Sequence, residues 1–156
     1  MCDVTIYATL CFLLRGNEVL LIRKKRGFGA GKYNGVGGRV EEGESPEEAA
    51  VREVLEEVGV RVLELEPAGK LEFYSTSSRP DWVVYVYKSR RFEGEPRPSD
   101  EAEPRWFSVR SLPFEEMWAD DRLWLPHVLA GHRVKGRFWF NEDYSALLRW
   151  EVEAEP

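Results

Sequence analysis

Residues 38–60 constrain the fold of this chain more than any other stretch, because they join a glycine-rich loop to a well-capped helix. Ser45 is a natural N-cap, Pro46 suits the first helical position, and Glu48 completes a capping box. Gly59 favours a left-handed residue that ends the helix. The sequence therefore predicts a helix that begins after Ser45 and stops at Gly59.

The expected helix has an apolar face and an acidic face. The residues that recur at helical spacing and should face a core are Ala50, Val51, Val54, Leu55 and Val58. Glu53, Glu56 and Glu57 fall on the opposite side, where positions three and four apart are neighbours. Together with Glu44 from the loop, they form a hard-oxygen site suited to Mg²⁺ or Mn²⁺. For the three helical glutamates alone, a solvated face of repelling charges is the alternative.

The spacing of the whole stretch is more specific than the helix. It follows the pattern G-x5-E-x7-R-E-V-x-E-E-x-G-V, with Gly38, Glu44 and Arg52 at fixed positions. On these residues the chain resembles the Nudix superfamily, hydrolases of nucleoside diphosphate-linked compounds. The resemblance implies an α+β fold in which a mixed β-sheet core is flanked by helices as an α/β/α sandwich. It also implies that Arg52 braces the loop and orients the glutamates, although an arginine beside glutamates can equally be an ordinary surface partner.

Two further motifs extend the resemblance over nearly the whole chain. Residues 24–35 have the sequence KKRGFGAGKYNG, and residues 118–121 have the sequence WADD. The pair is similar to the MutT-homologue branch, whose members hydrolyse oxidised purine nucleoside triphosphates. Ala119 stands where the branch has proline, and Ser75 and Trp82 stand where it has a different mix of side chains. We therefore expect this chain to discriminate between oxidised, methylated and normal purines differently from other members of the branch.

The chemistry of these motifs fits a purine pocket. Trp118 offers a flat face for stacking. Asp120 and Asp121 can read the base edge, because a neutral acid donates a hydrogen bond while a carboxylate only accepts. The resemblance makes Phe28 a second wall, Thr9 the floor and Lys24 a neighbour of the phosphates. The substrate-binding residues it implies are Thr9, Lys24, Phe28, Asn34, Trp118, Asp120 and Asp121. The alternatives are a helix cap for the aspartates, a core or surface anchor for the aromatic residues and a solvated lysine.

The resemblance also implies a metal-dependent mechanism. The implied metal site comprises Gly38, Glu44, Glu53, Glu56, Glu57 and Glu101, with Asp100 as the alternative to Glu101 because the register of that loop is open. Mg²⁺ is the expected cofactor and Mn²⁺ the second candidate. Water attacks the α-phosphorus and pyrophosphate leaves, with Glu53, Glu56 and Arg52 as the catalytic residues. Glu53 or Glu56 takes the proton from water, and the sequence does not separate the base from the metal ligands.

Length, charge and cysteine content bound the remaining properties. A chain of 156 residues supports one core, so we expect residues 1–156 to form a single domain. The net charge of −6 argues against stable nucleic-acid binding and favours a small anionic nucleotide that arrives with its metal. Cys2 and Cys11 form neither a zinc motif nor a disulfide framework. Residues 4–14 are too short to cross a membrane. The expectation is a cytoplasmic monomer.

Strand and turn signals predict the other elements. Strands are expected at 4–14, 19–24, 61–66, 70–75, 82–87 and 105–108, and residues 93–104 are expected to form an exposed loop. Short helices are expected at 113–117 and 121–130, the second capped by Asp120 or Asp121 and ended at Gly131. A hairpin of residues 133–140 and 145–152 completes the chain.

Three functions compete. The first is hydrolysis of oxidised purine nucleoside triphosphates, favoured by residues 118–121 together with Asn34. The second is a Nudix hydrolase of ADP-ribose, another sugar nucleotide, a dinucleoside polyphosphate or a capped RNA end. The third is a noncatalytic nucleotide-binding domain that keeps the fold. Because such domains usually lose carboxylates that this chain retains, the sequence favours an enzyme.

Overall fold

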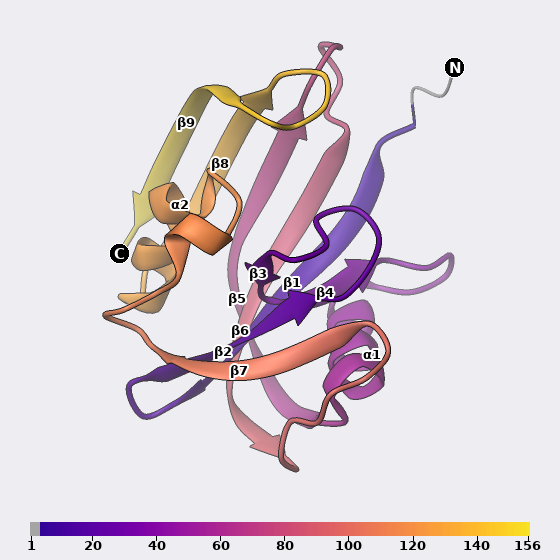
Figure 1. The fold of residues 1–156 in the computed structure, drawn as a ribbon, viewed down its shortest axis with the longest axis vertical. Helices are drawn as coiled ribbons and strands as arrows, with labels where there is room; N and C mark the ends of the chain where they lie inside the picture. The colour runs from indigo at the N-terminus through magenta and orange to yellow at the C-terminus, as the bar shows by residue number, and fades with distance from the viewer. Residues whose placement is uncertain (1–3) are drawn as a thin grey trace.

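The computed structural model describes residues 4–156, so Cys2 lies outside the described chain (Figure 1). Over these residues, nine strands form one sheet of order β3-β2-β1-β6-β5-β8-β9, with β4 paired to β1 and β7 paired to β2. The elements are β1 (Ile6–Arg15), β2 (Glu18–Lys24), β3 (Tyr33–Asn34), β4 (Val36–Arg39), α1 (Pro46–Val58), β5 (Arg61–Tyr74), β6 (Trp82–Glu93), β7 (Ala102–Ser108), the 3₁₀ turn η1 (Phe114–Glu116), α2 (Asp121–Leu129), β8 (Arg133–Phe140) and β9 (Leu147–Glu155). The pairs β1–β6 and β5–β8 are parallel, so the sheet is mixed.

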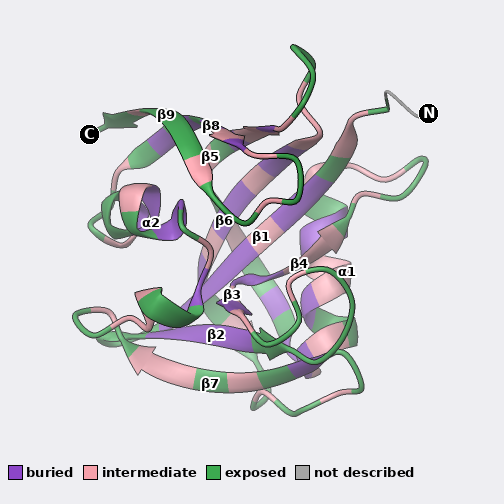
Figure 2. Cartoon of the chain, turned by 45° about the horizontal axis from the view of Figure 1, so that its top comes forward, coloured by how far each residue is buried: buried purple, intermediate pink, exposed green. Residues whose placement is uncertain are grey.

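Strand β1 is buried on both faces, as Figure 2 shows. Because side chains alternate along a strand, Phe12 packs on one side with Trp124 of α2, and Leu13 packs on the other with Val54 of α1. Each helix thus covers its own face of the sheet, with a separate cluster of apolar side chains beneath it. The expected fold, a mixed sheet between helices, is confirmed.

The expected helix after Ser45 is confirmed in its bounds and caps. The Ser45 hydroxyl accepts from the Glu48 backbone N–H at 3.1 Å, and the Glu48 carboxylate accepts from the Ser45 N–H at 2.9 Å. Gly59 adopts a left-handed conformation with φ of 72°. These bonds satisfy backbone groups that a helix end otherwise leaves unpaired.

The apolar face of α1 differs from the expectation at one position. Val54 and Val58 are buried, but Leu55 is 52% exposed, so its assignment to the core was wrong. Ala49 is fully buried in its place. A helix of 3.6 residues per turn puts Leu55 at the edge of the apolar stripe, where the sheet no longer covers it.

Strand β5 corrects the expected break at residues 67–69. It runs without interruption from Arg61 to Tyr74, with shifts of register against β6 near Pro67 and Gly69. A Cβ atom on Gly69 would overlap the backbone carbonyl of Val134 in β8. The glycine therefore marks a close approach of two strands and not a turn.

Three other boundaries differ from the sequence prediction. Strand β6 continues to Glu93, and β7 begins at Ala102, inside the expected loop. Pro104 is accepted in β7 because that strand pairs only with β2 and leaves its other edge free. The glycine-rich segment after β2 contains the short strands β3 and β4, which the sequence did not indicate. The hairpin of β8 and β9 and the turn between β1 and β2 are confirmed.

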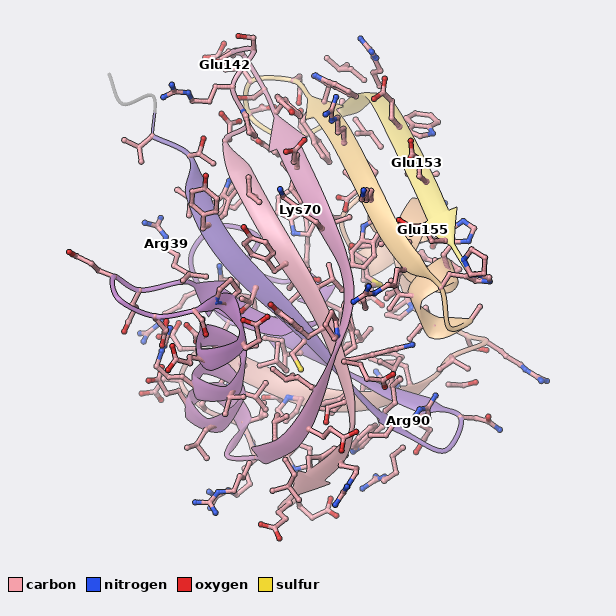
Figure 3. All side chains as sticks on the ribbon, turned by 180° about the vertical axis from the view of Figure 1, so that it is seen from behind. Arg39, Lys70, Arg90, Glu142, Glu153 and Glu155 are labelled. Carbon is pink, nitrogen blue, oxygen red and sulfur yellow. The ribbon has the colours of Figure 1, made fainter. Side chains whose placement is uncertain are left out.

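The outer surface carries the charged groups. Seen from behind, the labelled Lys70 lies over the middle of the sheet (Figure 3), and Lys70, Arg39, Arg90, Glu142 and Glu153 are all exposed. In the described part of the chain, no helix has the length and apolar character needed to span a bilayer.

Candidate active site

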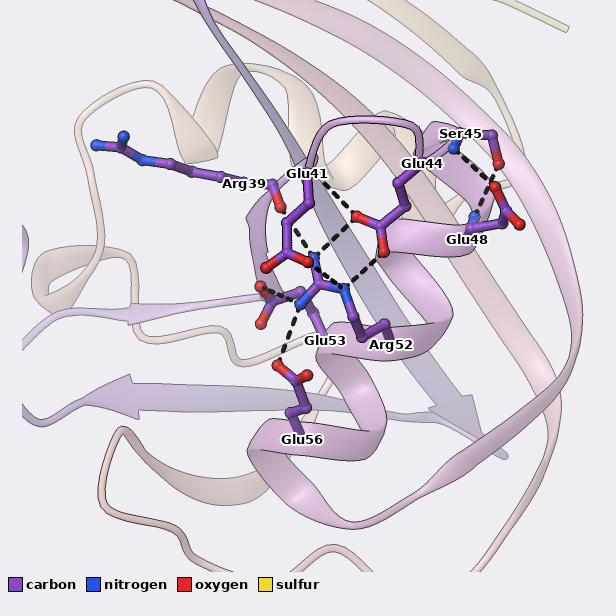
Figure 4. A network of polar contacts seen from close by, with 8 residues as sticks. All are labelled: Arg39, Glu41, Glu44, Ser45, Glu48, Arg52, Glu53 and Glu56. Atoms are coloured by element: carbon purple, nitrogen blue, oxygen red, sulfur yellow. Dashed lines mark hydrogen bonds and ion pairs between the residues drawn. The ribbon is translucent and has the colours of Figure 1, made fainter.

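Arg52 of α1 is the centre of an acidic network (Figure 4). Its Nε and Nη2 atoms donate to the two oxygens of Glu44 at 2.6 and 3.0 Å. Its Nη1 atom donates to Glu53 at 3.2 Å and to Glu56 at 3.1 Å. Nη2 also donates to the backbone carbonyl of Arg39 at 3.0 Å. One guanidinium therefore ties the end of β4 and the following loop to the acidic face of the helix.

The network keeps Arg52 and Glu44 ionised. The hydrogen bond from Arg52 holds the pKa of Glu44 below its ordinary value, and the bond to Glu44 raises the pKa of Arg52 further. Charge-assisted bidentate pairs of this kind fix orientation as well as charge. In this structure both Glu44 oxygens are occupied by arginine, so direct ligation of a metal by Glu44 requires this pairing to loosen.

Glu53 and Glu57 form a second, more buried pair. Burial raises the pKa of Glu57 to about 9, and its hydrogen bond with Glu53 adds to the effect. Burial also raises the pKa of Glu53, against the opposing influence of its bond with Glu57 and of Arg52. The two carboxyl groups are hydrogen-bonded to each other, and the raised pKa values of both favour a proton between them. Gly38 makes room for them, because a Cβ atom at that position would overlap the Glu53 carboxylate.

The donor set suits a hard divalent cation, although no cage is preformed. Among residues 4–156, no three His, Cys, Asp or Glu side chains converge closely enough to hold an ion. The carboxyl groups of Glu53 and Glu57 nevertheless meet in a partly buried place with raised pKa values, and metal binding by protonated ligands releases protons. Glu56 is more exposed, at 58%, and faces Arg52. These oxygens fit Mg²⁺ or Mn²⁺ by their chemistry.

A cavity of about 210 Å³ lies beside the glutamates. The expected site residues that line it are Thr9, Lys24, Phe28, Asn34, Gly38, Glu57, Trp118, Asp120 and Asp121. Those outside the lining are Glu44, Arg52, Glu53, Glu56 and Glu101. Glu57 lines the cavity and bonds to Glu53, and Gly38 lines it and contacts Glu53, so these two residues connect the cavity to the acidic network.

Asp120 and Asp121 are buried at the inner end of the cavity lining, 3% and 2% exposed. The indole Nε1 of Trp124 donates to Asp120 at 2.8 Å, and the backbone N–H of Trp118 donates to Asp121 at 3.0 Å. Asp120 occupies the N-cap position of α2, but no side chain caps this helix, so the expected aspartate cap is wrong. Trp124 holds the Asp120 carboxylate instead, one helical turn along.

Burial raises the pKa values of the two aspartates to different extents. Burial raises the pKa of Asp120 to about 6, although the bond from Trp124 opposes the change. Burial and then the charge of Asp120 raise the pKa of Asp121 well above its ordinary value. Two buried like charges cannot both ionise at low cost. These shifts favour a pair that holds one proton, and the pKa of Asp121 is raised by both burial and the Asp120 charge.

Aromatic side chains surround the cavity. The ring of Phe28 lies 5.1 Å from that of Trp118 and 6.5 Å from that of Trp82, nearly parallel to the latter. Gly29 sits against Trp118, because a Cβ atom there would lie 3.0 Å from the indole. Phe28 is 54% exposed, so its contacts are made at the mouth of the cavity and not in the core.

The polar groups of the cavity differ in how far they are satisfied. The Thr9 hydroxyl is buried, and within the described chain it has no hydrogen-bond partner. Asn34 accepts from the Gly35 N–H at 2.8 Å, and the Lys24 amine donates to the Phe28 carbonyl at 2.8 Å. A buried unpaired hydroxyl is costly, so it marks a place where a ligand can supply the missing bond.

Glu101 forms an ion pair with Arg26 outside the acidic network. Arg26 donates to its carboxylate at 2.6 Å, and both side chains are exposed. This bond holds the pKa of Glu101 below its ordinary value. The charge of Glu101 still contributes to raising the pKa of Glu57, so the loop lies near the site. A role for Glu101 at the metal remains a prediction.

Sequence reasoning missed several cavity residues, including Lys32, Phe73, Phe140 and Tyr144. It also missed the bond from Trp124 to Asp120, although their separation by four residues puts them on one face of a helix. Lys32 lies 5.1 Å from the Trp118 ring and lowers the pKa of Asp121, against the larger effect of burial. Tyr144 carries no local signal, because its place depends on how β8 and β9 return to the cavity.

Comparison with known proteins gives a consistent assignment. A family model described as NUDIX domain matches residues 5–128. The oxidized purine nucleoside triphosphate hydrolase of Danio rerio is 46% identical over 132 residues, which cover 85% of each chain. The protein of the same name from Mus musculus is 40% identical over 144 residues and 92% of each chain. The crystal structure of mMutator MutT protein from Bacillus halodurans matches with a TM-score of 0.84 and 29% identity, over 97% of this chain and 99% of that one.

Proposed function

Because this chain belongs to the Nudix family, we propose that it hydrolyses oxidised purine nucleoside triphosphates to the monophosphate and pyrophosphate. The observation that carries the substrate is the pair Asp120 and Asp121, buried in an aromatic cavity with unequal pKa values. The names of the fish and mouse relatives support the same substrate class.

The paired aspartates recognise the base by donating and accepting hydrogen bonds. A carboxylate accepts two or more hydrogen bonds, while a neutral carboxylic acid donates one. Oxidation of a purine changes donors and acceptors along its edge, so a pocket with one group of each kind can favour 8-oxo-dGTP or 2-hydroxy-dATP over normal nucleotides. Trp118 and Phe28 stack on the base, and the unpaired hydroxyl of Thr9 and the amide of Asn34 complete the polar contacts.

Nudix hydrolases generally need divalent metal ions, and the ion proposed here is Mg²⁺, held by Glu53, Glu56 and Glu57. When bound, the ion offsets phosphate charge and makes water a better nucleophile. The side chains of the chain do the positioning. Arg52 orients the glutamates through its bonds to Glu53 and Glu56, and one of these two carboxylates takes the proton from the attacking water.

The cavity binds the base of the substrate, and the acidic network lies beside its phosphates. With the base held against Trp118, the triphosphate runs past Gly38 and Glu57, which belong to both regions. Lys24 lines the same cavity and supplies a cation for the phosphates. Such positioning converts binding of the base into alignment of the α-phosphorus with water.

The proposal extends to the setting of the enzyme. The 156 residues act as one domain, as a monomer in the cytoplasm, and without stable nucleic-acid binding. The net charge of −6 supports the last of these points, because it repels nucleic acid.

The proposal is tested by pyrophosphate release in Mg²⁺ from 8-oxo-dGTP, 2-hydroxy-dATP, dGTP, dATP, ADP-ribose and diadenosine tetraphosphate. Subsaturating substrate makes the rates report kcat/KM, which measures specificity. We expect the oxidised purines to exceed the normal ones by at least about tenfold, the discrimination that one or two well-placed hydrogen bonds supply.

Two outcomes would contradict the proposal. Equal rates on oxidised and normal triphosphates would mean that Asp120 and Asp121 do not read the lesion. Activity restricted to ADP-ribose or diadenosine tetraphosphate would move the chain to another branch of the family.

A further inference from the structure

Tyr144 forms part of the cavity wall although it comes from the turn between β8 and β9, far along the chain from the other site residues. Its ring stacks on Phe140 at 4.9 Å and meets Phe28 edge-on at 5.8 Å. It also lies edge-on to Trp118 at 6.4 Å. The ring therefore touches both aromatic residues that the proposed function assigns to the base.

The backbone of Tyr144 is held in a conformation that side chains rarely adopt. Among the described residues it is the one non-glycine with positive φ, at 62°. A conformation of this kind costs free energy and persists only where its surroundings fix it. Here Asn141 fixes it, because its carbonyl accepts from the Tyr144 N–H at 3.0 Å and its amide donates to Ser145 at 2.8 Å.

The hydroxyl of Tyr144 is anchored from the opposite side of the cavity mouth. It donates to Oδ2 of Asp81 at 2.6 Å, and the Ser75 hydroxyl donates to the same oxygen at 2.5 Å. The backbone of Asp81 is itself fixed. Its N–H donates to the Phe73 carbonyl at 2.7 Å, and its carbonyl accepts from the Ile6 N–H at 2.8 Å. Three separate segments thus hold the ring in one orientation.

The anchor keeps the phenol neutral. Burial and then the Asp81 carboxylate raise the pKa of Tyr144 far above its ordinary value. The hydroxyl is therefore held as a donor to Asp81, and the ring presents a fixed apolar surface to the cavity.

We propose that Tyr144 is a specificity-determining residue, whose anchored ring closes the outer wall of the base cavity and limits it to flat purines without bulky substituents. This inference rests on the proposed function. It assigns to the β8–β9 turn a role in substrate choice, and to Asp81 and Ser75 the role of positioning the ring.

The test compares Tyr144→Ala and Tyr144→Phe with Trp150→Ala, a control that removes an exposed aromatic side chain from the same hairpin. Three quantities are measured: kcat and KM for 8-oxo-dGTP, kcat/KM for the bulkier O6-benzyl-dGTP, and the affinity for 8-oxo-dGMP from tryptophan fluorescence without metal. Stacking on the base is made equally in the ground state and the transition state. Its loss therefore raises KM and leaves kcat unchanged.

For Tyr144→Ala we expect KM for 8-oxo-dGTP to rise about tenfold with little change in kcat, as for the loss of one stacking wall. The ratio of kcat/KM for O6-benzyl-dGTP to that for 8-oxo-dGTP should rise by a similar factor. Tyr144→Phe and Asp81→Ala should show about threefold effects on KM, because the ring stays but loses its anchor. Asp81→Asn should be close to wild type, since the amide oxygen still accepts from Tyr144 and Ser75.

The outcomes separate this inference from the function on which it rests. If the wild-type protein neither hydrolyses 8-oxo-dGTP nor binds 8-oxo-dGMP, the proposed function fails and the inference fails with it. If the wild-type protein does both and the Tyr144 variants behave like Trp150→Ala, only the role of Tyr144 is overturned. A fall in kcat with unchanged KM would also overturn it.

Discussion

The acidic network around Arg52 and the aspartate pair in the cavity both bring carboxyl groups together, but they deal with the charge differently. In the network a guanidinium bonds to Glu44, Glu53 and Glu56, and the pKa of Glu44 falls. In the cavity Asp120 and Asp121 are buried, and their pKa values rise. One region is neutralised by a cation and the other by a proton.

The difference teaches how one type of side chain serves two kinds of chemistry. Carboxylates kept ionised at a partly exposed surface attract a divalent cation and can take a proton from water. A carboxyl kept neutral by burial can donate a hydrogen bond, which a carboxylate cannot. Glu53 and Glu57 lie between these extremes, because burial raises the pKa of both while Arg52 still bonds to Glu53.

Removing the metal should separate the two regions most completely. With EDTA in excess we expect pyrophosphate release from 8-oxo-dGTP to fall to the background rate, because the acidic network loses the ion that offsets phosphate charge. Binding of 8-oxo-dGMP, followed by tryptophan fluorescence, should change by less than about threefold, since base contacts dominate for the product. Restoration of turnover by Mg²⁺ is the control. Undiminished turnover in EDTA would show that the reaction does not depend on the network in this way.

Glu56→Gln should break the acidic network while sparing the cavity. We expect kcat to fall by about 10²–10⁴-fold, the range for loss of a general base, with the melting temperature little changed because Glu56 is exposed. The matched control is Glu42→Gln in the loop before α1, where the same change affects an exposed glutamate. A rate within error of wild type for Glu56→Gln sinks its catalytic assignment and leaves Glu53 as the base.

Trp118→Ala should affect the cavity and spare the network. Loss of the stacking ring is expected to raise KM for 8-oxo-dGTP by about tenfold or more while kcat changes little. Steady-state kinetics with 8-oxo-dGTP and dGTP measure the effect, with Trp150→Ala as the control for removal of an exposed indole. If KM is unchanged, Trp118 is only a structural neighbour of the cavity.

Asp120→Asn should show, through the dependence of stability on pH, that the cavity holds a buried carboxyl of raised pKa, in contrast to the lowered pKa of Glu44 in the acidic network. The folded pKa of Asp120, about 6, lies above the ordinary value of 3.8, so the folded state binds more protons and wild-type stability falls as pH rises through this window. The variant has no buried carboxyl to ionise at this position, so it does not lose stability in this way, and its amide oxygen can still accept from Trp124. We expect the free energy of unfolding of the variant to rise relative to the wild type between about pH 4 and pH 6. The difference should reach at most about 3 kcal/mol at neutral pH.

Urea unfolding at several pH values measures this gain. Asp100→Asn, which changes an exposed carboxylate in the same way, should alter stability by no more than about 0.5 kcal/mol. A gain for Asp120→Asn that does not vary with pH would contradict the proton as the source of the effect.

Local patterns were sufficient for the parts of this molecule that depend on neighbours in sequence. The capping box of Ser45 and Glu48 and the stop at Gly59 require only residues within one or two turns, and the structure has them as expected. The hairpin of β8 and β9 follows for the same reason. Leu55 was misassigned because periodicity gives the direction of a side chain but not the extent of the surface that covers it.

Long-range contacts account for the errors. Gly69 looked like a turn, and only the passage of β8 beside it explains the glycine inside a continuous strand. The aspartates at the start of α2 looked like a cap, and only their burial among aromatic side chains shows why they bond to Trp118 and Trp124 instead. Gly69 suits a turn but meets a distant strand, whereas the aspartates suit a cap but bond to residues three and four positions away because the fold buries them.

The sequence by itself determined the family, the capped helix and the acidic residues along one face of it, because spacing along a helix places side chains without reference to the rest of the chain. The tertiary structure decided which carboxyl groups stay ionised, since that depends on burial and on the arginine or carboxyl beside each one. It also decided that Tyr144, held by Asp81 of the turn before β6, lines the cavity. No local spacing encodes that contact, because the two residues are brought together only when the strands assemble.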